Sequence, residues 1–121
     1  MRRKILIVDD EAPTRDSFAA YFSRCGFDTA TADSIVASRR QTAAASFDLI
    51  LLDVGLADEN GLDLLATVKV DQPGVKVLIL TGRGYDGDLM SDALQKGADG
   101  YITKGLPMEE LLAAVQRTLA E

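Results

Sequence analysis

Residues suited to metal and phosphoryl chemistry follow four short segments of the chain that are predicted to be strands. They are the pair Asp9-Asp10 after residues 5–8, Asp53 after residues 49–52, Thr81 after residues 75–80 and Lys104 after residues 99–103. Carboxylate oxygens are preferred ligands of Mg²⁺, and an aspartate can act as the nucleophile that takes up a phosphoryl group. A hydroxyl group and an ammonium group both suit phosphoryl oxygens. These residue types indicate phosphoryl transfer to an aspartate.

The elements between these residues predict how they come together. Residues 49–52 form a four-residue apolar run, which is typical of a strand buried on both faces of a parallel sheet. Strands are predicted near residues 5–8, 27–32, 49–52, 75–80 and 99–103, and helices near 13–25, 33–46, 60–70, 88–96 and 107–120. This alternation predicts a parallel sheet with helices on both faces. The carboxyl ends of parallel strands lie at one edge of the sheet, so Asp9, Asp10, Asp53, Thr81 and Lys104 are expected to share one pocket.

The charge of this pocket predicts a bound cation. Carboxylates a few ångströms apart repel each other by roughly 4 kcal/mol per adjacent pair at an effective dielectric constant near 20. One lysine cannot offset three such carboxylates, and all the protein ligands on offer are oxygens. Mg²⁺ is therefore the expected cofactor. The site is then suited to accepting a phosphoryl group on Asp53 and neutralising its charge.

Composition narrows the remaining function classes. The chain has 121 residues, which fits one domain, and a net charge of −6 without a basic cluster, which argues against nucleic-acid binding by this domain. Its apolar runs are too short for a signal peptide or a membrane span, so a cytoplasmic domain is expected. Cys25 is the single cysteine and there is no histidine, which excludes an intrachain disulfide and a His/Cys zinc site. Cys25 continues an apolar helical stripe with Phe18 and Phe22 and is predicted to be buried.

Five short motifs resemble the receiver domain of two-component response regulators. They are Val8-Asp9-Asp10-Glu11, Leu52-Asp53-Val54, Leu80-Thr81-Gly82, the segment 97–101 (Gly-Ala-Asp-Gly-Tyr) and Ile102-Thr103-Lys104. The resemblance covers essentially the whole chain. It implies a doubly wound, five-stranded parallel sheet with strand order 2-1-3-4-5, a flavodoxin-like architecture. It also implies a single receiver domain over residues 1–121, either a stand-alone regulator or the receiver of a longer protein.

The same resemblance implies a signalling switch rather than an enzyme. A histidine kinase or histidine phosphotransfer protein would donate its phosphoryl group to Asp53 in the presence of Mg²⁺, and self-phosphorylation from small donors and self-dephosphorylation would be expected. Asp10, Asp53 and the backbone carbonyl of Gly55 would be direct metal ligands, with Asp9 acting through water. Thr81 and Tyr101 would form the switch pair.

The implied output is a change in the surface of the fourth helix, fifth strand and fifth helix, residues 88–120. An output domain or a separate protein would read this surface, and phosphorylation-linked homodimerisation is a further possibility. No membrane partner is expected.

Two departures from the receiver pattern bear on the site. Gly105 follows Lys104, where most receivers have proline, which predicts a less rigidly placed lysine. Gly55 stands where many members carry a bulkier side chain beside the phosphoryl group, so Gly55, Gly82 and Arg83 are the expected flanks. The small side chain predicts easy access of water to the acyl phosphate.

Other interpretations stay open from the residues alone. Asp10 could simply cap the first helix. A haloacid-dehalogenase-type phosphatase would need an aspartate where this chain has Gly55, and a flavodoxin-type binding module would need a phosphate-binding first loop where it has Asp9-Asp10-Glu11. A receiver-like scaffold that takes no phosphoryl group is the remaining alternative, against which the intact Asp53, Thr81 and Lys104 argue.

Overall fold

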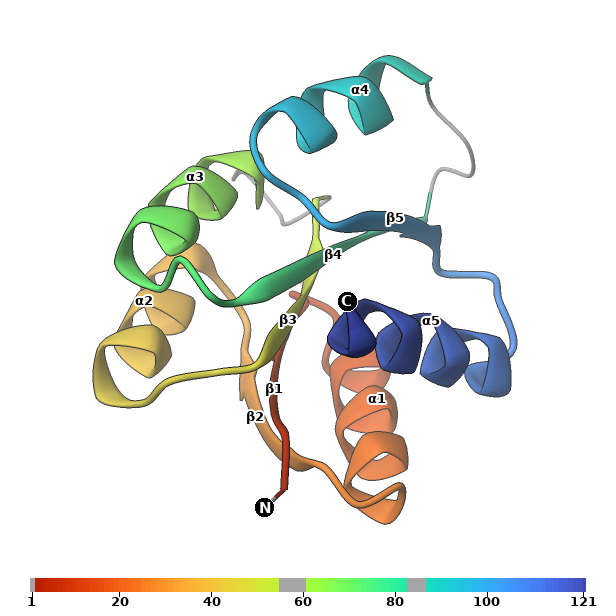
Figure 1. The fold of residues 1–121 in the computed structure, drawn as a ribbon. Helices are drawn as coiled ribbons and strands as arrows, with labels where there is room; N and C mark the ends of the chain where they lie inside the picture. The colour runs from red at the N-terminus through yellow and green to blue at the C-terminus, as the bar shows by residue number, and fades with distance from the viewer. Residues whose placement is uncertain (1, 55–60, 83–86) are drawn as a thin grey trace.

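Five strands and five helices alternate along the described part of the chain (Figure 1). The structure, a computed structural model, describes residues 2–54, 61–82 and 87–121. The strands are β1 (Lys4–Val8), β2 (Asp28–Ala32), β3 (Leu49–Asp53), β4 (Lys76–Thr81) and β5 (Gly100–Thr103). The helices are α1 (Ala12–Arg24), α2 (Ile35–Ala44), α3 (Gly61–Asp71), α4 (Gly87–Gln95) and α5 (Met108–Ala120).

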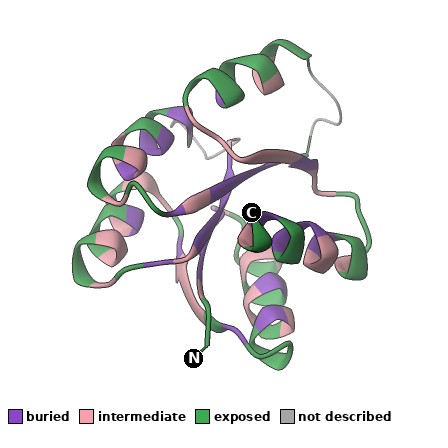
Figure 2. Ribbon diagram, viewed as in Figure 1, coloured by how far each residue is buried: buried purple, intermediate pink, exposed green. Residues whose placement is uncertain are grey.

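The strands form one parallel sheet in the order β2-β1-β3-β4-β5. This order confirms the predicted doubly wound fold. Strand β3 lies at the centre and is buried along its whole length, as its continuous apolar run predicts (Figure 2). Strand β2 lies at an edge and is only partly buried, in agreement with its weaker apolar pattern.

Alternate residues of the strands supply two separate cores. Leu6, Ile50 and Val77 point to the face covered by α2, α3 and α4. Ile7, Leu51 and Leu78 point to the other face, which α1 and α5 cover (Figure 1). The period of two along each strand therefore anchors helices on both sides of the sheet.

The end of α1 corrects one prediction. Cys25 is exposed, because the helix stops at Arg24 and Cys25 is its C-cap residue. Gly26 follows with a φ of 98°, and the Phe27 N–H donates to the Phe22 carbonyl at 3.1 Å, which closes a Schellman turn. The apolar spacing thus continues past the end of α1, so Cys25 has the helical period but does not lie on the helix face that packs against the sheet.

An ion pair joins α3 to the amino-terminal edge of the sheet, opposite the predicted site. Lys69 Nζ lies 2.7 Å from Asp99 Oδ2, which also accepts the Val77 N–H at 2.8 Å. Lys69 donates in addition to the Val75 carbonyl. Asp99, which belongs to the Gly-Ala-Asp-Gly-Tyr segment 97–101, therefore links the segment before β5 to α3 and β4.

No helix among the described residues is long and apolar enough to cross a membrane.

Candidate metal centre

The register of the sheet brings the predicted residues to one edge. Val8 is paired with Leu52, so the Asp9-Asp10 turn begins beside Asp53, the last residue of β3. Asp53 is in turn paired with Leu80, one residue before Thr81, and Thr81 is paired with Thr103. The Lys104 N–H donates to the Thr81 carbonyl at 2.8 Å, which places Lys104 directly after the last ladder pair.

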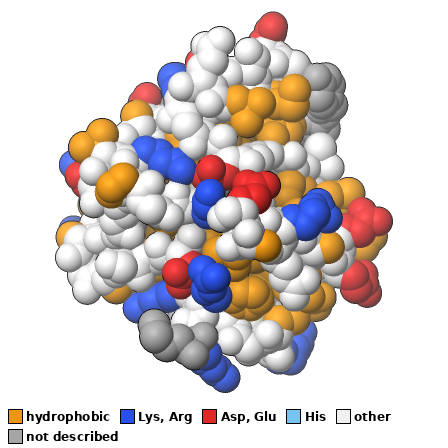
Figure 3. All heavy atoms as spheres, in the orientation of Figure 1, with side chains coloured by type: hydrophobic (Ala, Val, Ile, Leu, Met, Phe, Trp, Pro, Cys, Tyr) orange, Lys and Arg blue, Asp and Glu red, His pale blue; other side chains and the backbone are white. Residues whose placement is uncertain are grey.

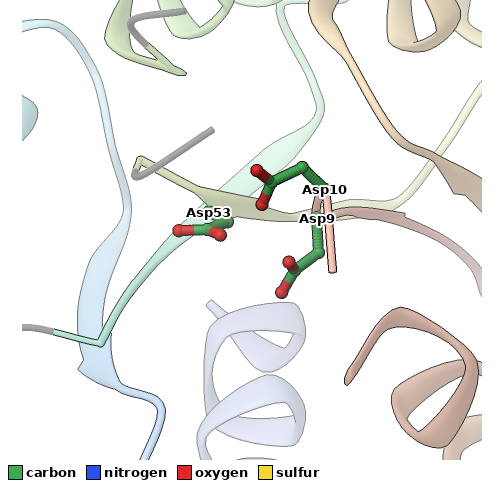
Figure 4. Close-up of side chains that lie close together, drawn as sticks. All are labelled: Asp9, Asp10 and Asp53. Atoms are coloured by element: carbon green, nitrogen blue, oxygen red, sulfur yellow. The ribbon is translucent and has the colours of Figure 1, made fainter. Parts of the chain in front are cut away.

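Three carboxylates gather at this edge. One carboxylate oxygen from each of Asp9, Asp10 and Asp53 lies within 4.8 Å of the others. Figure 4 shows Asp9 and Asp10 leaving the end of β1 in different directions, with Asp53 beside them on β3. Asp9 is 1% exposed and Asp53 is 3% exposed, whereas Asp10 is partly open to solvent. An all-oxygen set of this charge fits a hard divalent cation.

Lys104 supplies positive charge at the same point. Its Nζ lies 2.8 Å from Asp9 Oδ2 and 2.9 Å from Asp53 Oδ2. The carboxylate of Glu11 lies 3.4 Å from it on the solvent side. Burial lowers the pKa of Lys104, but its contacts with Asp9 and Asp53 outweigh burial and raise the pKa above that of a free lysine. The ammonium group therefore stays charged.

Asp9 is held at each of its polar groups. Its N–H donates to the Ala32 carbonyl and its carbonyl accepts from Arg15 Nη1 at 2.8 Å. Its carboxylate accepts the Glu11 N–H at 3.0 Å and pairs with Lys104. Burial raises the pKa of Asp9 above its ordinary value, the contacts with Lys104 and the Glu11 N–H lower it, and repulsion from Asp53 raises it; the net shift is upward. The deprotonated carboxylate is therefore costly without a cation.

The first turn of α1 shows what sequence reasoning missed. The N-cap of α1 is Glu11, not Asp10, and its side chain makes no capping hydrogen bond. The Glu11 carboxylate reaches Lys104 instead. Neither this contact nor that of Arg15 with the Asp9 carbonyl could be predicted, because both depend on where the helix begins relative to the strand end.

Thr81 and Tyr101 occupy different environments near this edge. Thr81 is 2% exposed at the end of β4. Tyr101 is half-buried on β5 and lines a groove of about 560 Å³ together with Met90 of α4, Arg117 of α5 and Leu106, which precedes α5. Figure 3 shows hydrophobic side chains gathered in the region between α4 and α5. The groove lies within the surface predicted to carry the output.

Of the three residues expected to flank the phosphoryl group, the structure describes Gly82. Gly55 and Arg83 lie outside the described residues. Gly82 is exposed, and Lys104 Cδ lies 4.0 Å from where a Cβ at Gly82 would be. Gly105 is exposed, and a Cβ built on it meets no atom within 4 Å. Lys104 thus contacts Asp53 although glycine, rather than proline, follows Lys104 in the sequence.

Comparison with known proteins identifies the family. Residues 5–116 match the response regulator receiver domain. The chain is 36% identical over 119 residues to the TorCAD operon transcriptional regulatory protein TorR of Escherichia coli K12, covering 98% of this chain and 51% of that protein. It is 33% identical to the DNA-binding transcriptional regulator NtrC of Rhizobium meliloti, covering 97% of this chain and 24% of that protein. The chain thus spans about half the length of the first of these curated relatives and about a quarter of the second.

Solved structures agree with the fold. A CheY-like response regulator receiver domain from Methanospirillum hungatei superimposes with a TM-score of 0.93 at 28% identity, covering 99% of this chain and 95% of that one. A response regulator from Burkholderia pseudomallei, crystallised with a phosphorylated aspartic acid, a calcium ion and citrate, gives a TM-score of 0.90 at 28% identity, covering 98% of this chain and 69% of that one. With the sheet order, the acidic edge and the match over residues 5–116, these findings place the chain in the receiver domain family of two-component response regulators.

Proposed function

We propose that this receiver domain takes up a phosphoryl group on Asp53 from a histidine kinase or a histidine phosphotransfer protein, with Mg²⁺ as cofactor. The observation that carries the proposal is the meeting of Asp53, two further carboxylates and Lys104 at one buried strand edge. A carboxylate oxygen of Asp53 would attack phosphorus, the bond from phosphorus to the donor nitrogen would break, and the imidazole would leave.

The residues around Asp53 would have separate roles in binding the cation and the phosphoryl group. Asp9, Asp10 and Asp53 would hold the cation, which supplies positive charge for the carboxylates and the phosphoryl oxygens; the Gly55 carbonyl remains a predicted ligand. Lys104 already lies 2.9 Å from Asp53 and is positioned to donate a charge-assisted hydrogen bond to the phosphoryl group. Phosphorylation adds about −1.5 to −2 charges near neutral pH. Lys104 would offset part of this charge, and Lys104 and Thr81 would both donate charge-assisted hydrogen bonds to the phosphoryl group in one conformation of the domain.

That conformational preference would carry the signal. Thr81 would move toward the phosphoryl group and Tyr101 would turn inward, changing the groove that Tyr101 lines between β5, α4 and α5. A ligand or modification shifts a two-state equilibrium by its differential interaction with the two states. We place the output surface on α4, β5 and α5, read by an output domain or a separate protein. Several relatives are transcriptional regulators longer than this chain, which supports an output domain as the reader of this surface.

Intact mass spectrometry tests the proposal. The purified chain is incubated with acetyl phosphate, with Mg²⁺ or with EDTA, beside Asp53→Asn and the exposed control Asp71→Asn. We expect one added phosphoryl group in the wild type and the control, none with EDTA and none in Asp53→Asn. A folded wild type that binds Mg²⁺ but gains no phosphoryl group would favour the scaffold interpretation instead.

The lifetime of the phosphorylated protein tests the roles predicted for the flanking residues Gly55 and Arg83. If water reaches the acyl phosphate past Gly55 and Arg83, the acyl phosphate should decay more slowly in Gly55→Asn, or its decay rate should change in Arg83→Ala. Unchanged decay in both variants would remove that prediction.

A further inference from the structure

Arg15 makes a contact that neither helix packing nor the predicted chemistry requires. It lies in the first turn of α1, is half-buried, and donates from Nη1 to the backbone carbonyl of Asp9 at 2.8 Å. A cation in the first turn opposes the helix dipole, and this turn contains no acidic residue to offset it. The position of Arg15 is thus unfavourable for the helix itself, and its contact points to the strand end.

The Asp9 carbonyl is where that contact has most effect. Strand β1 ends at Val8, so the ladder no longer fixes the next carbonyl. The Asp9 carbonyl belongs to the same planar peptide unit as the Asp10 N–H. Holding that carbonyl therefore fixes the plane from which Asp10 leaves the strand end.

We propose that Arg15 is a positioning residue for the metal centre, which orients the Asp9-Asp10 turn so that both carboxylates face the cation site beside Asp53. This inference rests on the proposed function, since it concerns the affinity of the same site for Mg²⁺. Removing a group that orients a metal ligand without itself contacting the metal typically lowers metal affinity by about 10- to 100-fold.

The charge of Arg15 taken alone predicts the opposite result. Arg15 is a cation close to three carboxylates that are expected to bind Mg²⁺, so its long-range field disfavours a second cation. If Arg15 acted only through its charge, its removal would tighten Mg²⁺ binding. If it orients the turn, its removal weakens Mg²⁺ binding. The sign of the change distinguishes the two roles.

The experiment compares Arg15→Met and Arg15→Lys with the wild type and with Arg24→Met, which removes the same charge at the exposed far end of α1. Mg²⁺ affinity is measured by titration calorimetry, and the stability of the metal-free proteins by urea unfolding. We expect Arg15→Met to bind Mg²⁺ about tenfold more weakly, with Arg15→Lys recovering part of the loss. Arg24→Met should bind like the wild type.

Hydrogen exchange in EDTA gives a second readout without metal. The Glu11 N–H, which donates to the Asp9 carboxylate, should exchange faster in Arg15→Met than in Arg24→Met. Phosphorylation of Arg15→Met should reach half of its maximal rate at a higher Mg²⁺ concentration than phosphorylation of the wild type does.

Three results would overturn the inference. Unchanged or tighter Mg²⁺ binding in Arg15→Met, with wild-type binding intact, would reject the positioning role and leave the proposed function standing. A loss of affinity matched by an equal loss in Arg24→Met would also reject it. Failure of the wild type to bind Mg²⁺ at all would reject the proposed function and this inference together.

Discussion

Replacing Asp9 with asparagine should stabilise the metal-free protein, although it removes an ion pair. The Asp9 carboxylate is 1% exposed and faces the carboxylates of Asp10 and Asp53. Asparagine keeps the shape and an oxygen that can accept the Glu11 N–H. It removes the charge that burial disfavours. Lys104 retains Asp53 and Glu11 as partners.

The distances give the size of the competing effects. At an effective dielectric constant near 20, the attraction of Lys104 across 2.8 Å amounts to about 6 kcal/mol. Repulsion from Asp10 and Asp53, each within 4.8 Å, amounts to at least about 3.5 kcal/mol per pair and so roughly cancels that attraction. The cost of burying the charge then remains uncompensated. We expect Asp9→Asn to raise the free energy of unfolding by about 1–2 kcal/mol, the usual size of a stabilising substitution.

The pH dependence follows with a definite sign. The pKa of Asp9 is raised in the folded state, so the folded protein binds this proton more tightly than the unfolded chain does. The wild type therefore loses stability as the pH rises from the ordinary aspartate pKa through the raised pKa of folded Asp9, and it regains this stability as the pH falls. The advantage of Asp9→Asn should be largest near neutral pH and should disappear below the ordinary aspartate value of 3.8.

Urea unfolding followed by circular dichroism, in EDTA and low salt, measures these differences. Asp16→Asn, an exposed substitution on α1, is the control and should change stability by no more than about 0.5 kcal/mol. Adding Mg²⁺ at ten times its dissociation constant should stabilise the wild type by about 1.4 kcal/mol and Asp9→Asn by less. A clear loss of stability in metal-free Asp9→Asn at neutral pH would refute this reasoning, because the Lys104 contact would then outweigh burial and repulsion.

Three further substitutions test the framework that holds the site, each by urea unfolding. Gly100→Ala should cost about 1–3 kcal/mol, because its Cβ would lie 2.6 Å from Leu78 Cδ2 in the core; unchanged stability would contradict this packing. Asp99→Asn should cost about 1.5–3 kcal/mol, while Asp92→Asn, in an exposed pair, should cost less than about 0.5 kcal/mol; equal losses would argue against the special role of the half-buried pair Lys69–Asp99. Gly105→Ala should leave both stability and phosphorylation essentially unchanged, since its Cβ meets open space, and a large loss of either would show that glycine is required there.

Much of the fold was predictable because local patterns and topology agree. Apolar runs of four residues mark the three central strands, and the doubly wound order follows from the family resemblance. Asp53 and Thr81 end apolar runs, so their meeting at one edge follows from parallel pairing alone. The site residues could therefore be named before any distance was known.

The remaining features depend on helix ends and on contacts between distant segments. Cys25 matches the period of its helix but lies just past the helix end, which periodicity does not locate. The pairs Lys69–Asp99 and Arg15–Asp9 join segments whose relative placement is set by tertiary packing. No spacing in the sequence distinguishes these two cations from ordinary solvated charges.

The most direct test of the central claim is to locate the phosphoryl group. After reaction with acetyl phosphate and Mg²⁺, borohydride reduction converts an aspartyl phosphate to homoserine, and tandem mass spectrometry of the peptides identifies the position. We predict homoserine at residue 53 and nowhere else. Reduction at another aspartate, or a phosphoryl group that resists borohydride and maps to a serine or threonine, would contradict the assignment of Asp53 as the phosphoacceptor.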